Sequence, residues 1–493
     1  MRAHRNAILC LAAIATLISV TADFALAQRV FSRGPSSNTG VSGPSRGGGG
    51  NYGGGGYRGG RWGGPGVIMV EPHMGPSGGQ YIDDDLPQGA RRLPQRSTRR
   101  GPNGAPAANE RRLVPDEVVI EIANSVSSQQ VDALQRRHRL TRIESQTFQL
   151  LGSTLFRWRI PDRRSVAAVV RALEADRVVA TAQPNYLFAL QQDEAKEAAE
   201  GDAAQYELAK LHLPQAHTLA KGDNVPVAVI DSGVDANHPE LAGAVAQTYD
   251  TLSAPMTPHK HGTAIAGLIA AHSRLMGAAP RAHVLAIRAF DGTGASAEGT
   301  TFNILKALDW AAANGARVIN MSFAGPPDPA MHRSLEAAHK KGIVLVAAAG
   351  NAGPKSPPLY PAADSNVIAV TATDADDKLF EQANRGRHIA VAAPGAQILV
   401  AIPDGGYEVA SGTSYSAAEV SGIVALMLER NGDLTPDKVR DILLATAKDL
   451  GPKGRDIMFG AGLANAYGAV TAEPDPKTAA MPRPVSRQST GAR

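Results

Sequence analysis

Three short motifs, far apart in the chain, hold the side chains that nucleophilic catalysis by serine requires. Asp231 lies in Val-Ile-Asp-Ser-Gly, His261 begins His-Gly-Thr, and Ser414 ends Gly-Thr-Ser. A serine hydroxyl attacks a carbonyl poorly unless a base takes its proton, and an imidazole does so best when a buried carboxylate fixes its tautomer. Because 30 and 153 positions separate the three residues, only a whole folded domain can bring them together.

The stretch from Gln205 to about Ala472 has the pattern of an α/β domain. Apolar runs typical of strands alternate with helical segments. We predict strands over 225–230, 282–287, 317–322 and 343–349, and helices from Thr263, over 300–314 and over 330–341. This alternation indicates a mostly parallel sheet with helices on both faces. Reactive side chains in such sheets gather at the carboxyl ends of strands, where Asp231 and Asn351 stand.

The first 27 residues have the features of a signal peptide. Arg2 and Arg5 form a charged start, residues 7–20 an apolar run, and residues 25–27 an Ala-Leu-Ala cleavage site. The run is shorter than the roughly 20 residues of a membrane helix, and we expect no transmembrane segment. The chain's one cysteine, Cys10, lies inside this segment. We therefore expect a secreted or periplasmic protein, cut after about Ala27, without disulfides or thiol chemistry.

Residues 28–112 form a Gly/Arg/Pro-rich linker that we expect to be disordered. Residues 31–80 contain 19 glycines and few aliphatic side chains, so burial cannot offset the entropy cost of ordering them. Twelve arginines against five acidic residues give the linker a charge of +7 in a chain of +4, so the basic balance does not describe the domain that follows. Aromatic residues among the glycines would also suit an RNA-binding tail. Behind an export signal we favour a solvated spacer and expect no nucleic-acid partner.

Residues 113–190 have the pattern of a small α+β domain. Strand patterns alternate with helical stretches, the strands including 117–122, 155–160 and 178–182. Ser165 stands where it would cap the second helix. The order strand–helix–strand–strand–helix–strand is the split βαβ, or ferredoxin-like, plan, and a generic α+β domain fits the same pattern. An acidic connector over 193–201 is open to cleavage, and residues 473–493 form a tail that we expect to be disordered.

Five segments resemble those of the subtilisin-like serine proteases (subtilases), in the right order and at plausible spacing: 225–235, 261–267, 319–325, 345–351 and 411–422. Each motif alone occurs often by chance, but the full set makes coincidence improbable. The likeness covers roughly residues 205–470, and residues 113–190 resemble the family's propeptide more weakly. It implies a subtilisin-like catalytic domain over 205–472. It also implies an exported serine endopeptidase that is made as a self-processed zymogen.

The resemblance assigns a role to each residue of the trio. Ser414 is the nucleophile that forms an acyl-enzyme, His261 is the general base and then the acid, and Asp231 orients the imidazole. Because His261 must be neutral to begin the cycle, activity should fall as pH drops through about 6–7. Asn351 matches the family's oxyanion-hole asparagine, whose side-chain N–H would act beside the Ser414 backbone N–H. The plainer alternative is that Asn351 only ends a strand in a turn.

The resemblance also assigns the walls of the substrate cleft. They comprise Ser322, Phe323, Ala324 and Gly325 on one side and Ala349 and Gly350 on the other. A second edge over 291–297 would let an extended protein or peptide substrate pair as an added strand. Ala324 stands where many relatives have glycine, so the cleavage preference stays open.

Several positions depart from the family pattern. Ala264 replaces a second histidine, and Tyr-Ser-Ala-Ala-Glu over 415–419 replaces the usual Met-Ala-x-Pro-His. The segment 271–277 is short for the family's strongest calcium loop, and Glu240 stands where an aspartate ligand is usual. Calcium needs six or more oxygen ligands, so we assign no metal site here. We expect no cofactor for catalysis, and a structural calcium elsewhere has no predicted location.

Two other functions stay open at this point. One is a catalytically impaired, subtilase-like binding protein, against which the intact Asp231, His261, Asn351 and Ser414 argue. The other is an exported esterase, which would favour a Gly-x-Ser-x-Gly elbow and the order Ser, Asp, His, whereas this chain has Asp, His, Ser. We expect a monomer whose own propeptide acts as an intramolecular chaperone and inhibitor.

Overall fold

The computed structural model describes residues 104–191, 205–252, 257–292 and 297–472. The predicted signal peptide (1–27), most of the predicted linker (28–112), the connector (193–201) and the tail (473–493) lie outside these residues. Residues 104–112 of the predicted linker are described, and the Gly104 amide donates to Glu174 Oε1 at 2.6 Å. In the part of the chain that the structure describes, no helix is both long enough and apolar enough to cross a bilayer.

A seven-stranded sheet forms the centre of residues 205–472, in the order β14-β13-β12-β10-β5-β7-β6. Every neighbouring pair in it is parallel. The strands are β5 (Pro226–Asp231), β6 (Val245–Asp250), β7 (His283–Arg288), β10 (Val318–Met321), β12 (Val344–Ala348), β13 (Val367–Thr373) and β14 (Ile389–Pro394). The predicted α/β class with a parallel sheet is confirmed.

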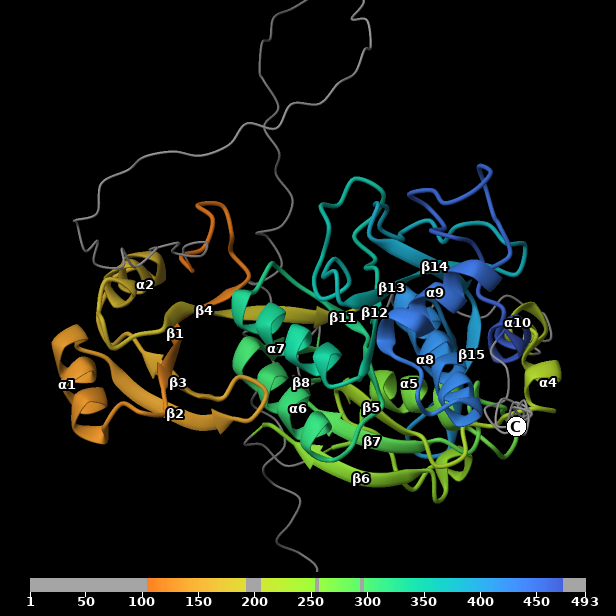
Figure 1. Cartoon of the computed structure of the whole chain (residues 1–493), viewed down its shortest axis with the longest axis horizontal. Coiled ribbons are helices and arrows are strands. Elements are labelled where there is room, and N and C mark those ends of the chain that lie inside the picture. Colours follow the sequence, from red (N-terminus) through yellow and green to blue (C-terminus); the bar gives the residue numbers. More distant parts are fainter. Residues whose placement is uncertain (1–103, 192–204, 253–256, 293–296, 473–493) are drawn as a thin grey trace, which may run out of the picture. The chain divides into compact units, whose positions relative to one another are not determined.

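Helices cover both faces of this sheet because successive strand residues point to opposite sides. Val227 and Val229 of β5 pack with one set of helices, whereas Ala228 and Ile230 pack with another. The first set is α5 (Lys260–Ala270), α8 (Thr413–Arg430), α9 (Pro436–Thr446) and α10 (Ala466–Thr471), and the second is α6 (Thr301–Ala313) and α7 (Pro329–Lys340). Figure 1 shows α6 and α7 on one side of the sheet and α5 and α8 on the other. The strands and helices predicted between 225 and 349 are all present, with ends shifted by one to three residues.

Short elements complete this domain. They are α3 (Tyr206–Lys210), α4 (Leu213–Ala216), the 3₁₀ turn η1 (Pro239–Leu241), β8 (Phe290–Asp291), β9 (Glu298–Thr300), β11 (Phe323–Ala324), and the antiparallel pair β15 (Ile398–Ile402) and β16 (Gly406–Ala410). Strands β8, β9 and β11 lie outside the main sheet and join a second one. That second sheet links the large domain to residues 104–191.

Residues 104–191 form a small unit with the elements β1 (Leu113–Ala123), α1 (Ser128–His138), β2 (Thr141–Phe148), β3 (Ser153–Arg159), α2 (Val166–Glu174) and β4 (Thr181–Leu190). The strand order is β2-β3-β1-β4, with antiparallel neighbours, which is the order of the split βαβ plan. Ser165 caps α2 by accepting from the Ala168 amide at 3.3 Å, as predicted. Trp158 is fully buried in the core of this unit.

Strand β4 is longer than predicted and leaves its own sheet. The sequence predicts a strand over 178–182, whereas β4 runs from Thr181 to Leu190. Its first half pairs with β1, and its second half pairs antiparallel with both β9 and β11 of the large domain (Figure 1). The prediction stopped short because the partners of the second half lie more than a hundred positions further along the chain.

Side chains of β4 also cap two helices of the large domain. The Gln183 side chain accepts from the Ala330 amide at the start of α7 at 2.9 Å. The Asn185 side chain accepts from the Phe302 amide at the start of α6 at 3.2 Å. The first amides of a helix have no partner within the helix. Asn185 satisfies one of them at α6, and Gln183 shares the Ala330 amide of α7 with the N-cap residue Asp328.

Candidate active site

The carboxyl edge of the parallel sheet and the starts of two helices bring the three predicted residues together. Asp231 is the last residue of β5, His261 lies in the first turn of α5, and Ser414 lies in the first turn of α8. All three are fully buried. The close approach of α5 to the turn after β5 requires Gly262, since a Cβ there would lie 2.2 Å from the Gly233 carbonyl oxygen.

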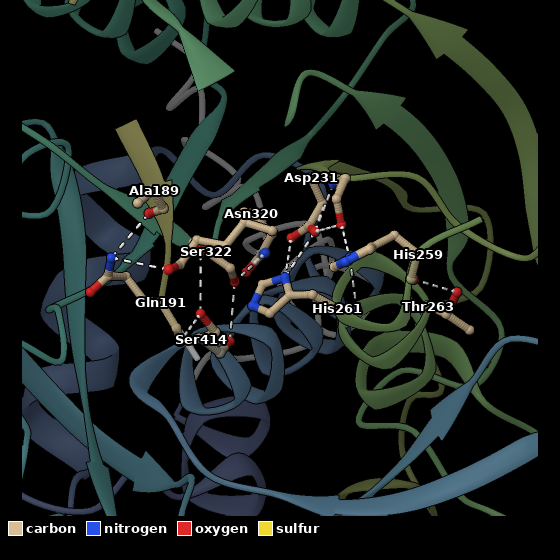
Figure 2. Close-up of polar contacts among 11 residues, drawn as sticks. Ala189, Gln191, Asp231, His259, His261, Thr263, Asn320, Ser322 and Ser414 are labelled. Carbon is tan, nitrogen blue, oxygen red and sulfur yellow. Dashed lines mark hydrogen bonds and ion pairs between the residues drawn. The ribbon is translucent and has the colours of Figure 1, made fainter. Parts of the chain in front are cut away.

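Asp231 and His261 form a buried pair (Figure 2). The Nδ1 atom of His261 lies 2.8 Å from Oδ1 and 2.9 Å from Oδ2 of Asp231. The Ser232 backbone amide donates to Oδ1 at 2.7 Å, and the Ser232 hydroxyl lies 3.0 Å from the same oxygen. With a proton on Nδ1, His261 presents the lone pair of Nε2, which is the tautomer that a general base needs.

The hydroxyl of Ser414 is turned away from His261 in this arrangement. It lies 2.6 Å from the carbonyl oxygen of Gln191 and 3.1 Å from that of Ser322. The Nε2 atom of His261 is buried and has no hydrogen-bond partner. The site therefore contains a proton donor, the Ser414 hydroxyl, and an unpartnered acceptor, His261 Nε2. The Ser414 side chain would have to rotate away from Gln191 before it could donate to His261.

The Asn351 side chain is held at its oxygen, while its NH2 group has no hydrogen-bond partner. Its Oδ1 accepts from the Thr413 amide at 3.1 Å and from the Thr413 hydroxyl at 2.8 Å, whereas its Nδ2 is buried and unpartnered. The turn that carries Asn351 needs glycine at 350, where φ is +111° and a Cβ would lie 2.5 Å from the Asn384 side chain. A buried donor without an acceptor is costly to keep.

The end of β4 lies in a groove between two strands: β11, which belongs to the edge that the sequence assigns to substrate, and β9, which begins just after the predicted second edge over 291–297. On one side Phe323 pairs with Leu190 and Ala324 with Ala189. On the other side β9 pairs with β4, and the Leu190 amide donates to the Ala297 carbonyl at 3.3 Å. The Gln191 amide then donates to the Ser322 carbonyl at 3.2 Å.

The other three assigned wall residues, Gly325, Ala349 and Gly350, make different contacts. Gly325 gives room to Phe188 of β4, because a Cβ there would lie 2.3 Å from the Phe188 ring. Ala349 and Gly350 bond elsewhere: the Ala349 carbonyl accepts from Asn384, and the Gly350 amide donates to the Thr413 hydroxyl. The structure thus brings Ser322, Phe323, Ala324 and Gly325 to the end of β4, whereas Ala349 and Gly350 form hydrogen bonds with Asn384 and Thr413.

The departures from the family pattern are buried around the site. The Tyr415 ring lies 6.0 Å from that of His261, centroid to centroid. Glu419, one turn further along α8, is almost fully buried, and so is Glu207 of α3. Burial raises the pKa of Glu207 to about 7. Burial and the neighbouring Glu207 raise the pKa of Glu419 well above its ordinary value.

The loop over 271–277, where the family has its calcium loop, directs backbone N–H groups at the Glu240 carboxylate. The Glu240 carboxylate accepts from the amides of Ser273, Arg274 and Leu275 at 3.0–3.1 Å and from the Tyr407 hydroxyl at 2.7 Å. Burial raises the pKa of Glu240, but these hydrogen bonds outweigh it and keep the pKa below its ordinary value. The loop presents N–H donors to a carboxylate, whereas calcium requires converging oxygens. Among the described residues no cluster of three or more His, Cys, Asp or Glu could hold a metal ion.

The structure adds residues that sequence reasoning missed. The backbone carbonyl of Gln191 contacts the Ser414 hydroxyl. The Gln191 side chain accepts from the backbone amide of Asn351 at 2.9 Å. Thr413 orients Asn351, and its presence in the Gly-Thr-Ser motif was a usable signal. His259 contacts the Ser232 hydroxyl, which in turn contacts Asp231. Its position two residues before His261 was the only signal in the sequence.

Comparisons with known proteins point to one family. The sequence model of the subtilase family matches residues 222–462. Thermitase of Thermoactinomyces vulgaris is 36% identical over 274 residues, which are 54% of this chain and 95% of thermitase. A thermophilic serine proteinase of Bacillus sp. strain AK1 is 36% identical over 316 residues, 62% of this chain and 76% of that protein. Subtilisin E of Bacillus subtilis is 35% identical over 274 residues, which are 54% of this chain and 70% of subtilisin E.

A solved structure shows the same fold. Fervidolysin from Fervidobacterium pennivorans, described as a keratinolytic enzyme related to subtilisin, matches with a TM-score of 0.62 at 24% sequence identity. The match covers 74% of this chain and 62% of fervidolysin.

Proposed function

The chain belongs to the subtilase family and is a serine-type endopeptidase, and we propose that it cuts peptide bonds with Asp231, His261 and Ser414 as its catalytic triad. One observation carries this assignment: the chain's own β4 lies in the groove as a paired strand, with the Gln191 carbonyl oxygen 2.6 Å from the Ser414 hydroxyl. A peptide carbonyl is therefore held beside the nucleophile. The hydrogen-bonded pair of His261, the general base, and Asp231 is formed beside it.

The reaction follows from this geometry. The Ser414 hydroxyl attacks the bound carbonyl carbon while His261 Nε2 takes its proton, and Asp231 stabilises the resulting imidazolium. The oxyanion receives the Asn351 side-chain N–H and the Ser414 amide, which lies at the start of α8 and has no acceptor within its own helix. His261 then donates the proton to the leaving amine. In the second half of the reaction His261 takes a proton from water, the water oxygen attacks the acyl carbon, and His261 returns the proton to the Ser414 oxygen as the acyl group leaves.

The small unit acts as an intramolecular propeptide in this proposal. Its β4 fills the substrate groove and its side chains cap α6 and α7, so it can hold the large domain together while it blocks the cleft. The position of Gln191 makes the bond between Gln191 and Gln192 the first self-cleavage site. The predicted connector after it, 193–201, would then be freed from the small unit.

We also propose where the enzyme acts and whether it needs a cofactor or calcium. The signal peptide over 1–27 directs the chain out of the cytoplasm, where a monomeric enzyme acts on protein or peptide substrates. Catalysis uses no cofactor. Glu240 replaces calcium at the loop over 271–277, since its carboxylate takes the loop amides directly.

A pair of serine variants tests the function. The wild-type chain, Ser414→Ala and Ser416→Ala are expressed side by side and assayed for size and for casein cleavage. Ser416 lies on the same helix, but its hydroxyl donates to Ala393 and Pro394 carbonyls in the interior. We expect wild type and Ser416→Ala to shorten and to cut casein, and Ser414→Ala to do neither. Equal processing of Ser414→Ala, with no casein cleavage by any of the three proteins, would overturn the proposal.

A further inference from the structure

A second histidine lies against the catalytic carboxylate, and the triad does not use it. His259, the residue that caps the start of α5, has its Nδ1 atom 2.7 Å from the Ser232 hydroxyl. That same hydroxyl lies 3.0 Å from Oδ1 of Asp231. Figure 2 draws the imidazoles of His259 and His261 beside Asp231.

The Ser232 hydroxyl has one proton and two acceptors within reach. It can donate to Asp231 or to a neutral His259, but not fully to both. The His261 backbone amide also points to the Nδ1 atom of His259, at 3.3 Å, which requires a lone pair on that nitrogen. A neutral His259 therefore accepts both donors and draws the Ser232 proton away from Asp231.

Protonation of His259 reverses this arrangement. Nδ1 then donates to the Ser232 oxygen, so the Ser232 proton must point to Asp231. The carboxylate gains one more hydrogen bond and a positive charge nearby, and both changes reduce its ability to stabilise a protonated His261. A weaker partner for the imidazolium means a weaker general base.

We infer that His259 is a positioning residue that sets, through the Ser232 hydroxyl, how strongly Asp231 supports His261. The inference rests on the proposed triad. Protonation of His259 would therefore remove activity in addition to the protonation of His261 itself, so that two protons contribute to the loss of activity in acid.

The surroundings of His259 fit this role. Burial lowers the pKa of His259, as do the nearby His261 and Lys260, while Asp231 raises it, and the net pKa is below the ordinary value. These are the charged and titratable groups that act on it from β5 and α5, and Lys260 lies 3.8 Å from Glu408 of β16. The His259 ring also packs against Gly292, where a Cβ would lie 2.5 Å from it. His259 is thus neutral in the working enzyme and takes up its proton only in acid.

The test is the pH profile of kcat/KM for the processed enzyme, with Phe-Ala-Leu-Gln p-nitroanilide, the sequence of residues 188–191, as substrate. Each profile is normalised to its own plateau. On the acid side of the wild-type profile, we expect the slope of log kcat/KM against pH to steepen from the value for one proton towards the value for two. His259→Asn accepts hydrogen bonds but takes no charge, so its slope should stay at the one-proton value. Lys260→Met, which leaves His259 in place, should keep the steep limb.

The Ser232→Ala background shows whether the hydroxyl carries the effect. There, the difference between histidine and asparagine at 259 should shrink several-fold. Wild type and His259→Asn with superimposable limbs, a His259→Asn effect on KM alone, or an undiminished difference in Ser232→Ala would each overturn the inference. Wild-type enzyme without Ser414-dependent cleavage would instead overturn the triad assignment, and this inference with it.

Discussion

At the scale of single residues, the site keeps two polar atoms buried without partners, Nε2 of His261 and Nδ2 of Asn351. A buried polar group without a hydrogen bond costs about 1–3 kcal/mol, so each needs a reason. Both atoms would gain a partner only during the reaction: the first takes the Ser414 proton and the second donates to the oxyanion. The stability cost and the proposed catalytic role lie in the same atoms.

Asn351→Ala should therefore lower kcat and leave substrate binding almost unchanged. Removing the corresponding donor in subtilisin itself lowers kcat about 10²–10³-fold, and we carry that order over to this chain. Steady-state kinetics on the processed enzyme give kcat and KM separately. Thr413→Val, which removes the hydroxyl that holds Asn351 Oδ1, should lower kcat by a smaller factor. A rise in KM at constant kcat would show that Asn351 serves binding or the turn instead.

The sequence predicts the positions of residues that lie at the end of a recognisable strand or helix pattern. Asp231 follows an apolar strand, and Ser414 lies at the start of a long helix that is buried over most of its length, so their meeting at one sheet edge follows from the α/β pattern. His259 and Gln191 carry no such pattern. Their roles depend on neighbours that only the folded chain supplies, Ser232 for the first and Ser414 for the second.

At the scale of elements, β4 joins the strands of the small unit to strands of the large domain, and its two halves have different partners. Its first half completes the small unit's sheet, and its second half lies between β9 and β11. The strand that periodicity predicts, 178–182, overlaps β4 only at Thr181 and Ala182, although the first half of β4 pairs within the small unit. The second half is set by long-range contacts, such as the edge-to-face packing of Phe188 on Phe323.

Gly325→Ala should slow self-processing. The added Cβ would lie 2.3 Å from the Phe188 ring, so β4 must shift and Gln191 must leave its place beside Ser414. We expect at least about a tenfold slower conversion of precursor to mature enzyme, since small displacements of a bound substrate cost about 10²-fold in rate. Gly432→Ala is the matched control, because its Cβ meets only one atom, at 3.8 Å. Equal conversion of both variants, followed by gel electrophoresis over time, would contradict this account of β4.

The ionised Glu240 carboxylate should stabilise the loop over 271–277. Its folded pKa is lowered, so the stability that it contributes is present above the unfolded pKa of about 4.5 and is lost as pH falls. At neutral pH, Glu240→Gln should shorten the half-life at elevated temperature several-fold, since hydrogen bonds to a charged group contribute about 1.5–3 kcal/mol. Chelation of calcium should change the wild-type half-life far less than this substitution does. Strong protection of the wild type by calcium, abolished in Glu240→Gln, would show that a cation binds here.

At the scale of the whole molecule, Glu207 and Glu419 are two buried carboxyls, one at the start of the large domain and one on the helix that carries Ser414. Glu207 belongs to α3, the first element after the connector, and Glu419 lies on α8. Burial of both carboxyls favours their protonated forms. The pair therefore opposes the folded state once the pH is high enough to ionise it.

The sign of the pH dependence follows from the raised pKa. An unfolded glutamate ionises near 4.5, whereas Glu207 ionises at about 7 in the folded chain. Stability is therefore highest below about 4.5 as far as this pair is concerned, and it falls as pH rises towards 7, by an order of 3 kcal/mol. In a Ser414→Ala background, which prevents self-digestion, Glu419→Gln should be more stable than its parent at pH 8 and similar at pH 5. Chemical denaturation at both pH values measures this, and lower stability of Glu419→Gln at pH 8 would refute it.

The most direct measurement of the central claim is the amino terminus of the processed protein, determined by mass spectrometry for the wild type and for Ser414→Ala. The claim is that Ser414 attacks the carbonyl of Gln191, which the structure holds 2.6 Å from its hydroxyl. We predict a wild-type fragment that begins at Gln192 at the earliest time points and is absent from Ser414→Ala. A first cut elsewhere, or the same cut in Ser414→Ala, would contradict the account.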